Sequence, residues 1–338
     1  MGRRGWVLGG MAVALLLAFL LHVGIGSRYW YLPWDIAREI LRGPMAEPTS
    51  DNAIVWSIRL PRAVEALTVG AILGLVGSAF QAQLRNPLAD PYIVGVSSGA
   101  AIGGVLVQVF GLATAAFGLG LPLAGFATGM ATLALVTALA RRRGLVDVTT
   151  LLLAGVAVGT LLSAVTSLVL LAAGKDTNVV LSWLLGSLGH ASWSHNALLA
   201  VFTVSGGALL VSQSRRLNAF AVGEDTASRL GVDVPRLRTV VLTTGTAMTA
   251  AAVGAVGIIG FLGLAAPHLS RRLLGVDWRY SLMGAGLLGG LLLLLADLIA
   301  QRGMSILTNT PGMDIPVGIV TAILGAPSLL ILMRRKGS

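Results

Sequence analysis

Apolar residues occur along this chain in long runs that are separated by short polar segments. A helix that crosses a bilayer needs about 20 mostly apolar residues. The pattern therefore predicts an all-α polytopic membrane protein with about ten spans and a single transmembrane domain over residues 1–338. The predicted spans are Trp6–Ile25, Ala63–Gln83, Tyr92–Phe110, Leu119–Ala140, Leu151–Ala173, His195–Gln213, Thr239–Gly257, Ile258–Leu274, Ser281–Ala300 and Pro316–Met333.

Two of these runs need interpretation. The first begins with Arg3-Arg4, as a signal peptide does, but no convincing cleavage site follows, so we interpret it as a retained helix. The stretch Thr239–Pro267 carries no charge but is too long for one straight helix, and it is broken by Gly254, Gly257, Gly260 and Gly263. We divide it into one full span and one short span.

The largest polar segment between the spans is residues 215–238. Within it, Glu224 to Leu230 is predicted to form a short helix that has acidic residues in its first turn and ends at Gly231. Asp233 and Pro235 are expected to begin the next helix. Ala227 and Leu230 are expected to share one apolar face. This compact surface suits a soluble partner, and the alternative is an interfacial helix lying on lipid, which the acidic residues disfavour.

Composition narrows the class of protein. The chain is 55% hydrophobic and 11% charged, with a mean hydropathy of +0.85, which excludes an ordinary soluble domain. It contains no cysteine, which excludes disulfides and thiol chemistry. With the N-terminus in the cytoplasm, 17 of the 24 basic residues fall on the cytoplasmic side. The net charge of +10 is thus explained by orientation, with both termini cytoplasmic, and not by nucleic-acid binding.

Small residues recur at a spacing of four, which lets helices approach closely and favours a compact bundle. The pairs are Gly70/Gly74, Gly99/Gly103, Gly125/Gly129, Gly155/Gly159 and Gly286/Gly290. The general abundance of glycine in membrane helices is the other explanation for such pairs.

Polar motifs lie at the helix ends. In Arg59-Leu60-Pro61-Arg62, Pro61 suits the first turn of a helix. The two guanidinium groups are expected either to receive carboxylates of a protein partner or to extend to the membrane interface. At the other end of the same span, Arg85–Pro91 contains two prolines and predicts a tight turn.

The segment Leu181–Gly189 is too short to cross a bilayer, so it predicts a half-helix, although an aromatic belt also explains Trp183. Asp297, Arg302 and Asp314 flank the outer loop before the last span. Asp297 lies close enough to the bilayer to require a partner.

Catalysis within this chain is not expected. No phosphate-binding Gly-x-x-x-x-Gly-Lys-[Ser/Thr] motif occurs, so the chain cannot hydrolyse ATP by itself. The four histidines are scattered and none forms a His/Glu pair with metal-ligand spacing, which disfavours an intramembrane enzyme or a metal site.

Taken together, these segments resemble the FecCD family of permeases, the membrane subunits of binding-protein-dependent ABC importers for iron–siderophore complexes, haem and cobalamin. The resemblance covers nearly the whole chain after the first span. The motifs that carry it are Arg59-Leu60-Pro61-Arg62, Arg85-Asn86-Pro87-Leu88-Ala89, Gly223-Glu224 with Ala227 and Leu230-Gly231, Pro267-His268 with Arg271, and Leu324-Gly325-Ala326-Pro327.

The resemblance implies a homodimeric permease in a bacterial inner membrane, with an ATPase dimer docked below it and a substrate-binding protein outside. ATP and magnesium would bind the ATPase, and no cofactor is expected in this chain. The implied ATPase-coupling residues are Gly223, Glu224, Asp225, Ala227, Leu230 and Gly231. Arg59, Arg62 and Arg302 are implied to dock the binding protein, and Asn86, Leu88 and Thr149 to form a cytoplasmic gate. Asp147-Val148-Thr149-Thr150 departs from the family pattern, which weakens the assignment of Thr149.

The expected function is ATP-driven import of a metal chelate, either an iron–siderophore complex or haem. A cobalamin importer of the same family is the alternative. An ion-coupled secondary transporter is the rival of another class, and the placement of the ionisable candidates at helix ends disfavours it. Few ionisable residues fall inside the predicted spans, so a path lined by small and polar side chains is expected.

Overall fold

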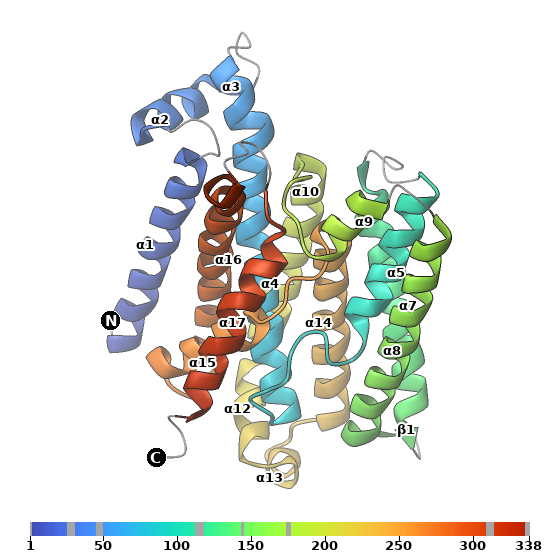
Figure 1. The fold of residues 1–338 in the computed structure, drawn as a ribbon. Coiled ribbons are helices and arrows are strands. Elements are labelled where there is room, and N and C mark those ends of the chain that lie inside the picture. The colour runs from blue at the N-terminus through green and yellow to red at the C-terminus, as the bar shows by residue number, and fades with distance from the viewer. Residues whose placement is uncertain are drawn as a thin grey trace.

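The computed structural model describes residues 2–25, 31–44, 50–111, 118–142, 145–173, 177–308 and 314–334. It is a bundle of helices that run roughly side by side, with α12 and α13 at one end and α2, α3 and α9 at the other (Figure 1). The helices are α1 (Arg3–Gly24), α2 (Pro33–Arg42), α3 (Ser50–Ile54), α4 (Leu60–Leu84), α5 (Val96–Val109), α7 (Gly120–Ala140), α8 (Val148–Ala173), α9 (Thr177–Leu184), α10 (Trp193–Val201), α11 (Gly207–Ser212), α12 (Ser214–Val222), α13 (Glu224–Arg229), α14 (Val234–Val256), α15 (Leu262–Leu274), α16 (Trp278–Thr308) and α17 (Val317–Arg334).

Two π-helical turns interrupt this pattern, η1 (Val55–Arg59) and η3 (Phe202–Gly206). The two short strands β1 (Arg141–Arg142) and β2 (Leu145–Val146) pair antiparallel beyond α7. The prediction of an all-α fold is confirmed apart from this minor ladder.

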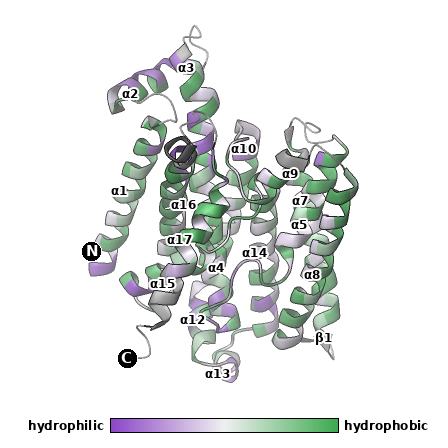
Figure 2. Cartoon of the chain, in the orientation of Figure 1, coloured by the Kyte–Doolittle hydropathy of each residue, from purple (hydrophilic) through white to green (hydrophobic). Residues whose placement is uncertain are grey.

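Within the described residues, seven helices are long and apolar enough to cross a membrane. The other three predicted spans correspond to α5, α15 and α17, which are shorter. The count of ten membrane crossings therefore stays a prediction. The second span begins earlier than predicted, because α3 and η1 continue into α4 as one helical run from Asp51 to Leu84. Apolar residues cover most of the outer helices, and polar residues gather at the two ends (Figure 2).

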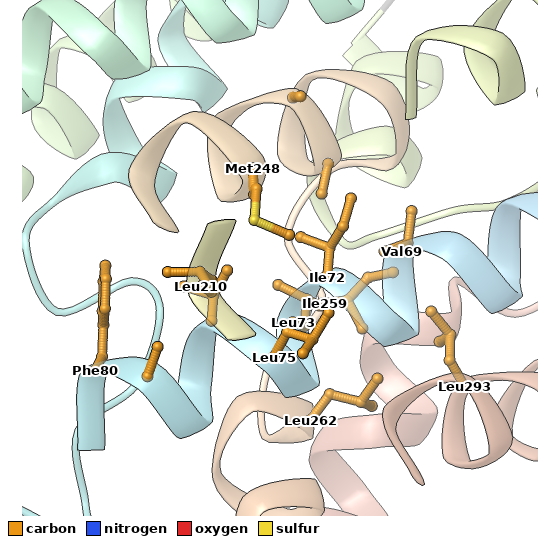
Figure 3. Close-up of a cluster of buried hydrophobic side chains, with 14 of the residues drawn as sticks. Val69, Ile72, Leu73, Leu75, Phe80, Leu210, Met248, Ile259, Leu262 and Leu293 are labelled. Carbon is orange, nitrogen blue, oxygen red and sulfur yellow. The ribbon is translucent and has the colours of Figure 1, made fainter. Parts of the chain in front are cut away.

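Helix α4 is the centre of the bundle, and most of its residues are buried. Its buried face packs against α11, α14, α15 and α16 in one apolar cluster (Figure 3). The side chains in this cluster include Val69, Ile72, Leu73, Leu75, Phe80, Leu210, Met248, Ile259, Leu262 and Leu293.

Glycines set the distance between α4 and α16. A Cβ atom on Gly74 would lie 2.1 Å from the backbone oxygen of Ala285, and one on Gly289 would lie 2.1 Å from the oxygen of Gly70. The backbones therefore touch directly. The close packing predicted from the spacing of small residues is confirmed for this pair of helices.

The uncharged stretch predicted to break near its glycines does break, between α14 and α15. Gly257 has a φ of 78°, and a Cβ there would lie 1.8 Å from the backbone oxygen of Trp183. Irregular backbone inside the bundle needs hydrogen-bond partners, and here Ser187 N donates to Val256 O while the Tyr92 hydroxyl donates to Ile259 O.

The half-helix predicted at Leu181–Gly189 is present as α9, but it lies earlier in the chain, at Thr177–Leu184. Trp183 is only 1% exposed and packs over Gly104. The aromatic-belt explanation of Trp183 is therefore wrong, because its ring fills the space above a glycine of α5 inside the bundle.

Candidate functional site

The polar segment 215–238 forms a compact structure at one end of the bundle (Figure 1). Gly223 separates α12 from α13, and Gly231 takes the left-handed conformation that ends the second helix, with a φ of 80°. The Asp233 carboxylate accepts a hydrogen bond from Arg236 N and so caps α14, which has Pro235 in its first turn. These local predictions are confirmed.

One detail of the prediction is wrong. Ala227 is fully buried, whereas Leu230 is 68% exposed, so the two residues do not form one apolar stripe. Helix α13 ends at Arg229, and Leu230 lies in the following turn, where helical spacing no longer applies. The exposed surface of α13 and of the turn after it includes Glu224, Asp225 and the projecting Leu230.

Polar contacts join this surface to the long helices. The Arg238 side chain of α14 forms an ion pair with Glu224 at 3.3 Å. On α12, Asn218 donates to the Asp277 carboxylate at 2.8 Å and accepts a hydrogen bond from Trp278 N, the first residue of α16. Hence a displacement of α12 and α13 acts on both α14 and α16.

Asp277 is the most connected side chain of this end. Hydrogen bonds from Arg279 hold the pKa of its carboxyl well below the usual range, with a further contribution from Asn218. Arg4 at the start of α1 lies 3.5 Å from the same carboxylate. The loop between α15 and α16 thus ties together α1, α12 and α16.

The turn after α4 contains two of the three predicted gate residues. Arg85 ends the helix in the left-handed conformation, and the Asn86 side chain accepts a hydrogen bond from Leu88 N at 2.9 Å. Leu88 is 46% exposed. The predicted tight turn is therefore confirmed, and it presents an apolar side chain at the end of the bundle.

Thr149, the third predicted gate residue, is exposed in the first turn of α8. The close approach between α8 and the segment before α5 occurs at Gly155, where a Cβ would lie 2.6 Å from Ile93 O. That contact is six residues further along α8 than Thr149. The gate role of Asn86, Leu88 and Thr149 stays a prediction.

Gln81 links this turn to α15, a connection that the sequence did not indicate. Its side-chain nitrogen donates to Ala89 O and Gly263 O, both at 3.2 Å, and its oxygen accepts from Arg271 at 2.6 Å. Arg271 also lies 5.6 Å from the ring of Trp278. A pocket of about 210 Å³ lies here, lined by Gln81, Ala82, Arg85, Pro87, Ala221, Arg271 and Trp278.

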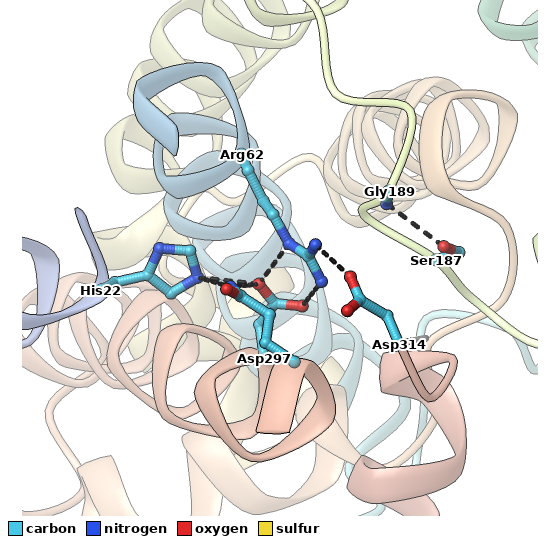
Figure 4. Close-up of polar contacts among 7 residues, drawn as sticks. His22, Arg62, Ser187, Gly189, Asp297 and Asp314 are labelled. Atoms are coloured by element: carbon cyan, nitrogen blue, oxygen red, sulfur yellow. Dashed lines mark hydrogen bonds and ion pairs between the residues drawn. The ribbon is translucent and has the colours of Figure 1, made fainter. Parts of the chain in front are cut away.

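At the opposite end of the bundle, Arg62 lies in a buried polar cluster that we call the outer network (Figure 4). Arg62 donates two hydrogen bonds of 2.8 Å to the carboxylate of Asp297 and a third to Asp314. The Asp297 carboxylate also bonds to His22 at 2.7 Å and to Gln301 at 2.9 Å. The outer network thus consists of His22, Arg62, Asp297, Gln301 and Asp314. The requirement of Asp297 for a partner, predicted from its depth, is confirmed.

Arg59 also bonds within the chain. Its guanidinium donates to Val23 O and Gly24 O, each at 2.9 Å, and lies 4.5 Å from the ring centre of Tyr31. Burial and a hydrogen bond to Asp51 raise the pKa of Tyr31 to about 12, so the phenol stays protonated. Because Arg59 is 9% exposed and the Arg62 side chain 13% exposed, the interpretation that these arginines extend to the interface is wrong.

A second buried pair of ionisable side chains lies next to the outer network. His195 of α10 is 3.3 Å from the carboxylate of Glu65 on α4, and its other ring nitrogen bonds to Gly118 O at 2.9 Å. Glu65 lies inside a predicted span, and it was not identified from the sequence as a buried ionisable residue. Its signal was a lone acidic residue in an apolar run, which by itself indicates a functional or paired side chain.

The sequence could not pair these groups, because Arg62 and Asp297 are 235 residues apart. Arg302, the third predicted docking residue, is half-buried on α16 near Gln301. Docking of a partner through Arg59, Arg62 and Arg302 stays a prediction. No group of three or more His, Cys, Asp or Glu side chains within the described residues could hold a metal ion.

The chain is similar in sequence to a known family of transport proteins. A model of the FecCD transport family matches residues 14–335. The chain is 39% identical to a cobalamin import system permease of Halobacterium salinarum, over 90% of this chain and 80% of that protein. It is 33% identical to the ferric dicitrate transport system permease FecC of Escherichia coli, over 98% of each.

A solved structure agrees with the fold as well. It is described as an inward-facing metal-chelate type ABC transporter, and it superposes with a TM-score of 0.83 at 32% identity. The match covers 98% of this chain and 99% of that one. The arrangement of helices is therefore shared along the whole length.

Proposed function

Because this chain belongs to the FecCD transport family, we propose that it is the membrane-spanning permease of an ATP-driven importer that carries a metal chelate into a bacterial cell. Two copies would enclose the path, and separate subunits would hydrolyse ATP and deliver the cargo. The absence of a phosphate-binding motif in the sequence supports this division of labour. No cofactor is assigned to this chain, and ATP with magnesium would bind the partner ATPase.

The observation that carries the proposal is the surface formed by Gly223 to Gly231. Its buried Ala227 fixes α13 against the bundle, while Glu224, Asp225 and Leu230 face outward. We assign this surface to the ATPase, which would receive Leu230 in an apolar depression. The cytoplasm then lies at the α13 end, together with both termini.

Movement of the ATPase can reach the path through contacts of this chain. Arg238 joins α13 to α14, and α14 leads to the break at Gly257. From α15, Arg271 contacts Gln81, which in turn holds Ala89 in the proposed gate turn. A tilt of α13 would thus displace Leu88 through α14, α15 and the side-chain amide of Gln81, in a switch between inward-open and outward-open states.

At the outer end, we propose that a substrate-binding protein docks over the outer network and Arg302. The Asp314 side chain is 29% exposed, whereas Asp297 is fully buried. An incoming carboxylate would therefore replace Asp314 on Arg62 and leave the Asp297 pair intact. The same end includes Arg59, whose bonds to α1 hold it in place beneath Tyr31.

The cargo proposed first is an iron complex, either a ferric siderophore or haem. Relatives named for ferric dicitrate and ferric enterobactin support an iron complex. Cobalamin is the second candidate, and the 39% identity to a cobalamin permease favours it specifically. Both are bulky metal chelates, and both agree with the metal-chelate transporter that shares the fold.

The test is uptake into proteoliposomes that contain the permease and its ATPase, with the binding protein added outside. Labelled ferric siderophore, haem and cobalamin are compared at equal concentration. We expect ATP-dependent uptake of one of them, and none without the ATPase. Uptake that persists without the ATPase and follows an ion gradient would establish the secondary transporter instead.

The coupling surface is tested in the same system with Glu224→Ala/Leu230→Ala. We expect the variant to be folded and inserted but to lose ATP-driven uptake. His190→Ala is the matched control, because His190 is exposed at the opposite end. Normal uptake by the double variant would remove the assignment of this surface to the ATPase.

A further inference from the structure

Helix α2 has an exposed apolar face that neither the bundle nor the proposed transport cycle uses. Trp34 is 65% exposed and Leu41 is 87% exposed. Together with Ala37 they recur at a spacing of three and four residues, so they lie on one side of the helix. Leu32 and Ile40 are exposed as well, at 50% and 36%.

The opposite side of α2 is fixed to the bundle. Ile36 is 1% exposed and reaches the end of α1, where its Cδ1 would lie 3.3 Å from a Cβ on Gly24. The buried Glu39 accepts a hydrogen bond from Asn52, and its backbone oxygen accepts one from Trp56. The orientation of the exposed face is therefore set by specific contacts.

The placement of α2 indicates what covers this face. Figure 1 shows α2 lying crosswise at the end of α1, at one outer edge of the bundle. Helix α1 exposes Val13, Leu16, Leu17 and Leu21, an apolar surface of the kind that faces lipid. Helix α2 lies at the end of this helix.

The basic side chains of α2 also suit a position at the surface of a membrane. Arg38 is exposed and follows the apolar face along one edge of the helix, next to Arg42, whose side chain is 40% exposed and forms an ion pair with Glu39 at 2.8 Å. An apolar face with tryptophan and a basic edge is the pattern of a helix that lies in the headgroup region. A soluble partner that docks transiently would leave Trp34 and Leu41 in water between cycles.

We propose that α2 is an interfacial anchor that lies in the outer leaflet of the membrane, with Trp34, Ala37 and Leu41 in contact with acyl chains and Arg38 at the headgroups. The anchor holds the outer end of α1 and, through Glu39 and Asn52, the start of the long helical run that carries Arg59 and Arg62. A docking site for the binding protein and an interface with a second copy are the competing occupants.

The absence of native cysteine makes the test direct. Single-cysteine variants Leu41→Cys, Leu20→Cys and His190→Cys carry a nitroxide label in proteoliposomes of phosphatidylethanolamine and phosphatidylglycerol. Collision of the label with oxygen, which concentrates in lipid, is compared with collision with a water-soluble nickel chelate. Leu20 on α1 is the lipid control and His190 in an exposed loop is the water control.

We expect the label at Leu41 to favour oxygen several-fold over the label at His190, and to approach the label at Leu20. Arg38→Gln in the Leu41→Cys background is expected to reduce this preference in vesicles rich in phosphatidylglycerol, and to change it less in phosphatidylcholine. A Leu41 label as accessible to nickel as the His190 label overturns the proposal. Protection that appears only when binding protein is added, or coupling between labels of two permease copies, also overturns it and assigns the face to that partner.

Discussion

The replacement Asp297→Asn tests whether the outer network is held by charge. Asp297 is fully buried and receives four hydrogen bonds, two from Arg62 and one each from His22 and Gln301. Asparagine has nearly the same shape but no charge, so it leaves the Arg62 guanidinium buried with Asp314 as its remaining anion. Removal of one partner from a buried ion pair costs about 3–5 kcal/mol.

The matched variant Asp314→Asn removes the other carboxylate of the same guanidinium. Because the Asp314 side chain is 29% exposed, water replaces part of the lost interaction, and we expect a cost of about 1 kcal/mol or less. The free energy of unfolding is measured by titration of the purified permease with dodecyl sulfate in mixed micelles. Retained α-helical circular dichroism in each variant shows that the starting state is folded.

A third variant separates charge from packing. Arg62→Met/Asp297→Leu replaces both members of the pair with apolar side chains of similar size. It should be more stable than Asp297→Asn, since the buried guanidinium is removed together with Asp297 and the remaining Asp314 carboxylate is 29% exposed to water. Equal costs for Asp297→Asn and Asp314→Asn, or a double variant no more stable than Asp297→Asn, would refute the reasoning.

Three further predictions concern the rest of the bundle. Gly74→Val is expected to destabilise the permease by about 3 kcal/mol or more, because its Cβ would meet the backbone of α16. The control Gly9→Val has open space around it and should leave the free energy of unfolding almost unchanged in the same dodecyl sulfate titration. Asp277→Asn should lower the thermal unfolding midpoint by the same amount at pH 6 and pH 8. The lowered pKa of Asp277 stabilises the fold above the unfolded pKa of about 4, so the difference should shrink as the pH falls below that value, and a difference that grows in acid would contradict the assignment. In the uptake assay, Gln81→Ala and Arg271→Ala should each reduce the rate of ATP-driven transport. The double variant should be little slower than either single variant, since the two side chains form one connection. Additive losses in the double variant would show that the two side chains act independently.

The spans could be predicted because each depends on a local property, a sufficient length of apolar residues. Helix α7 begins within one residue of its predicted start and ends at the predicted Ala140. Helix α2 was missed because its ten residues are too few for a span and its apolar and charged residues alternate. The second span was predicted too short, because the π-helical turn at Val55–Arg59 lets the helix continue through the arginines.

In the candidate sites, too, only the features that depend on neighbouring residues could be predicted. The caps at Gly231 and Asp233 were predicted because capping depends on neighbouring residues. The burial of Ala227 and the exposure of Leu230 could not be predicted, because both depend on where α13 ends against α14. The partners of Arg62 lie on α16 and in the segment before α17, and only the fold brings them together.

The buried charges also bear on the rival transporter class. An ion-coupled carrier needs titratable groups along its path near the middle of the membrane. Here Arg62 and Glu65 lie in the first two turns of α4, and the next two turns, around Val69 and Leu73, carry no ionisable side chain. These groups therefore fasten α1, α4, α10 and α16 at the Arg62 end of the bundle and do not continue along α4 as a relay.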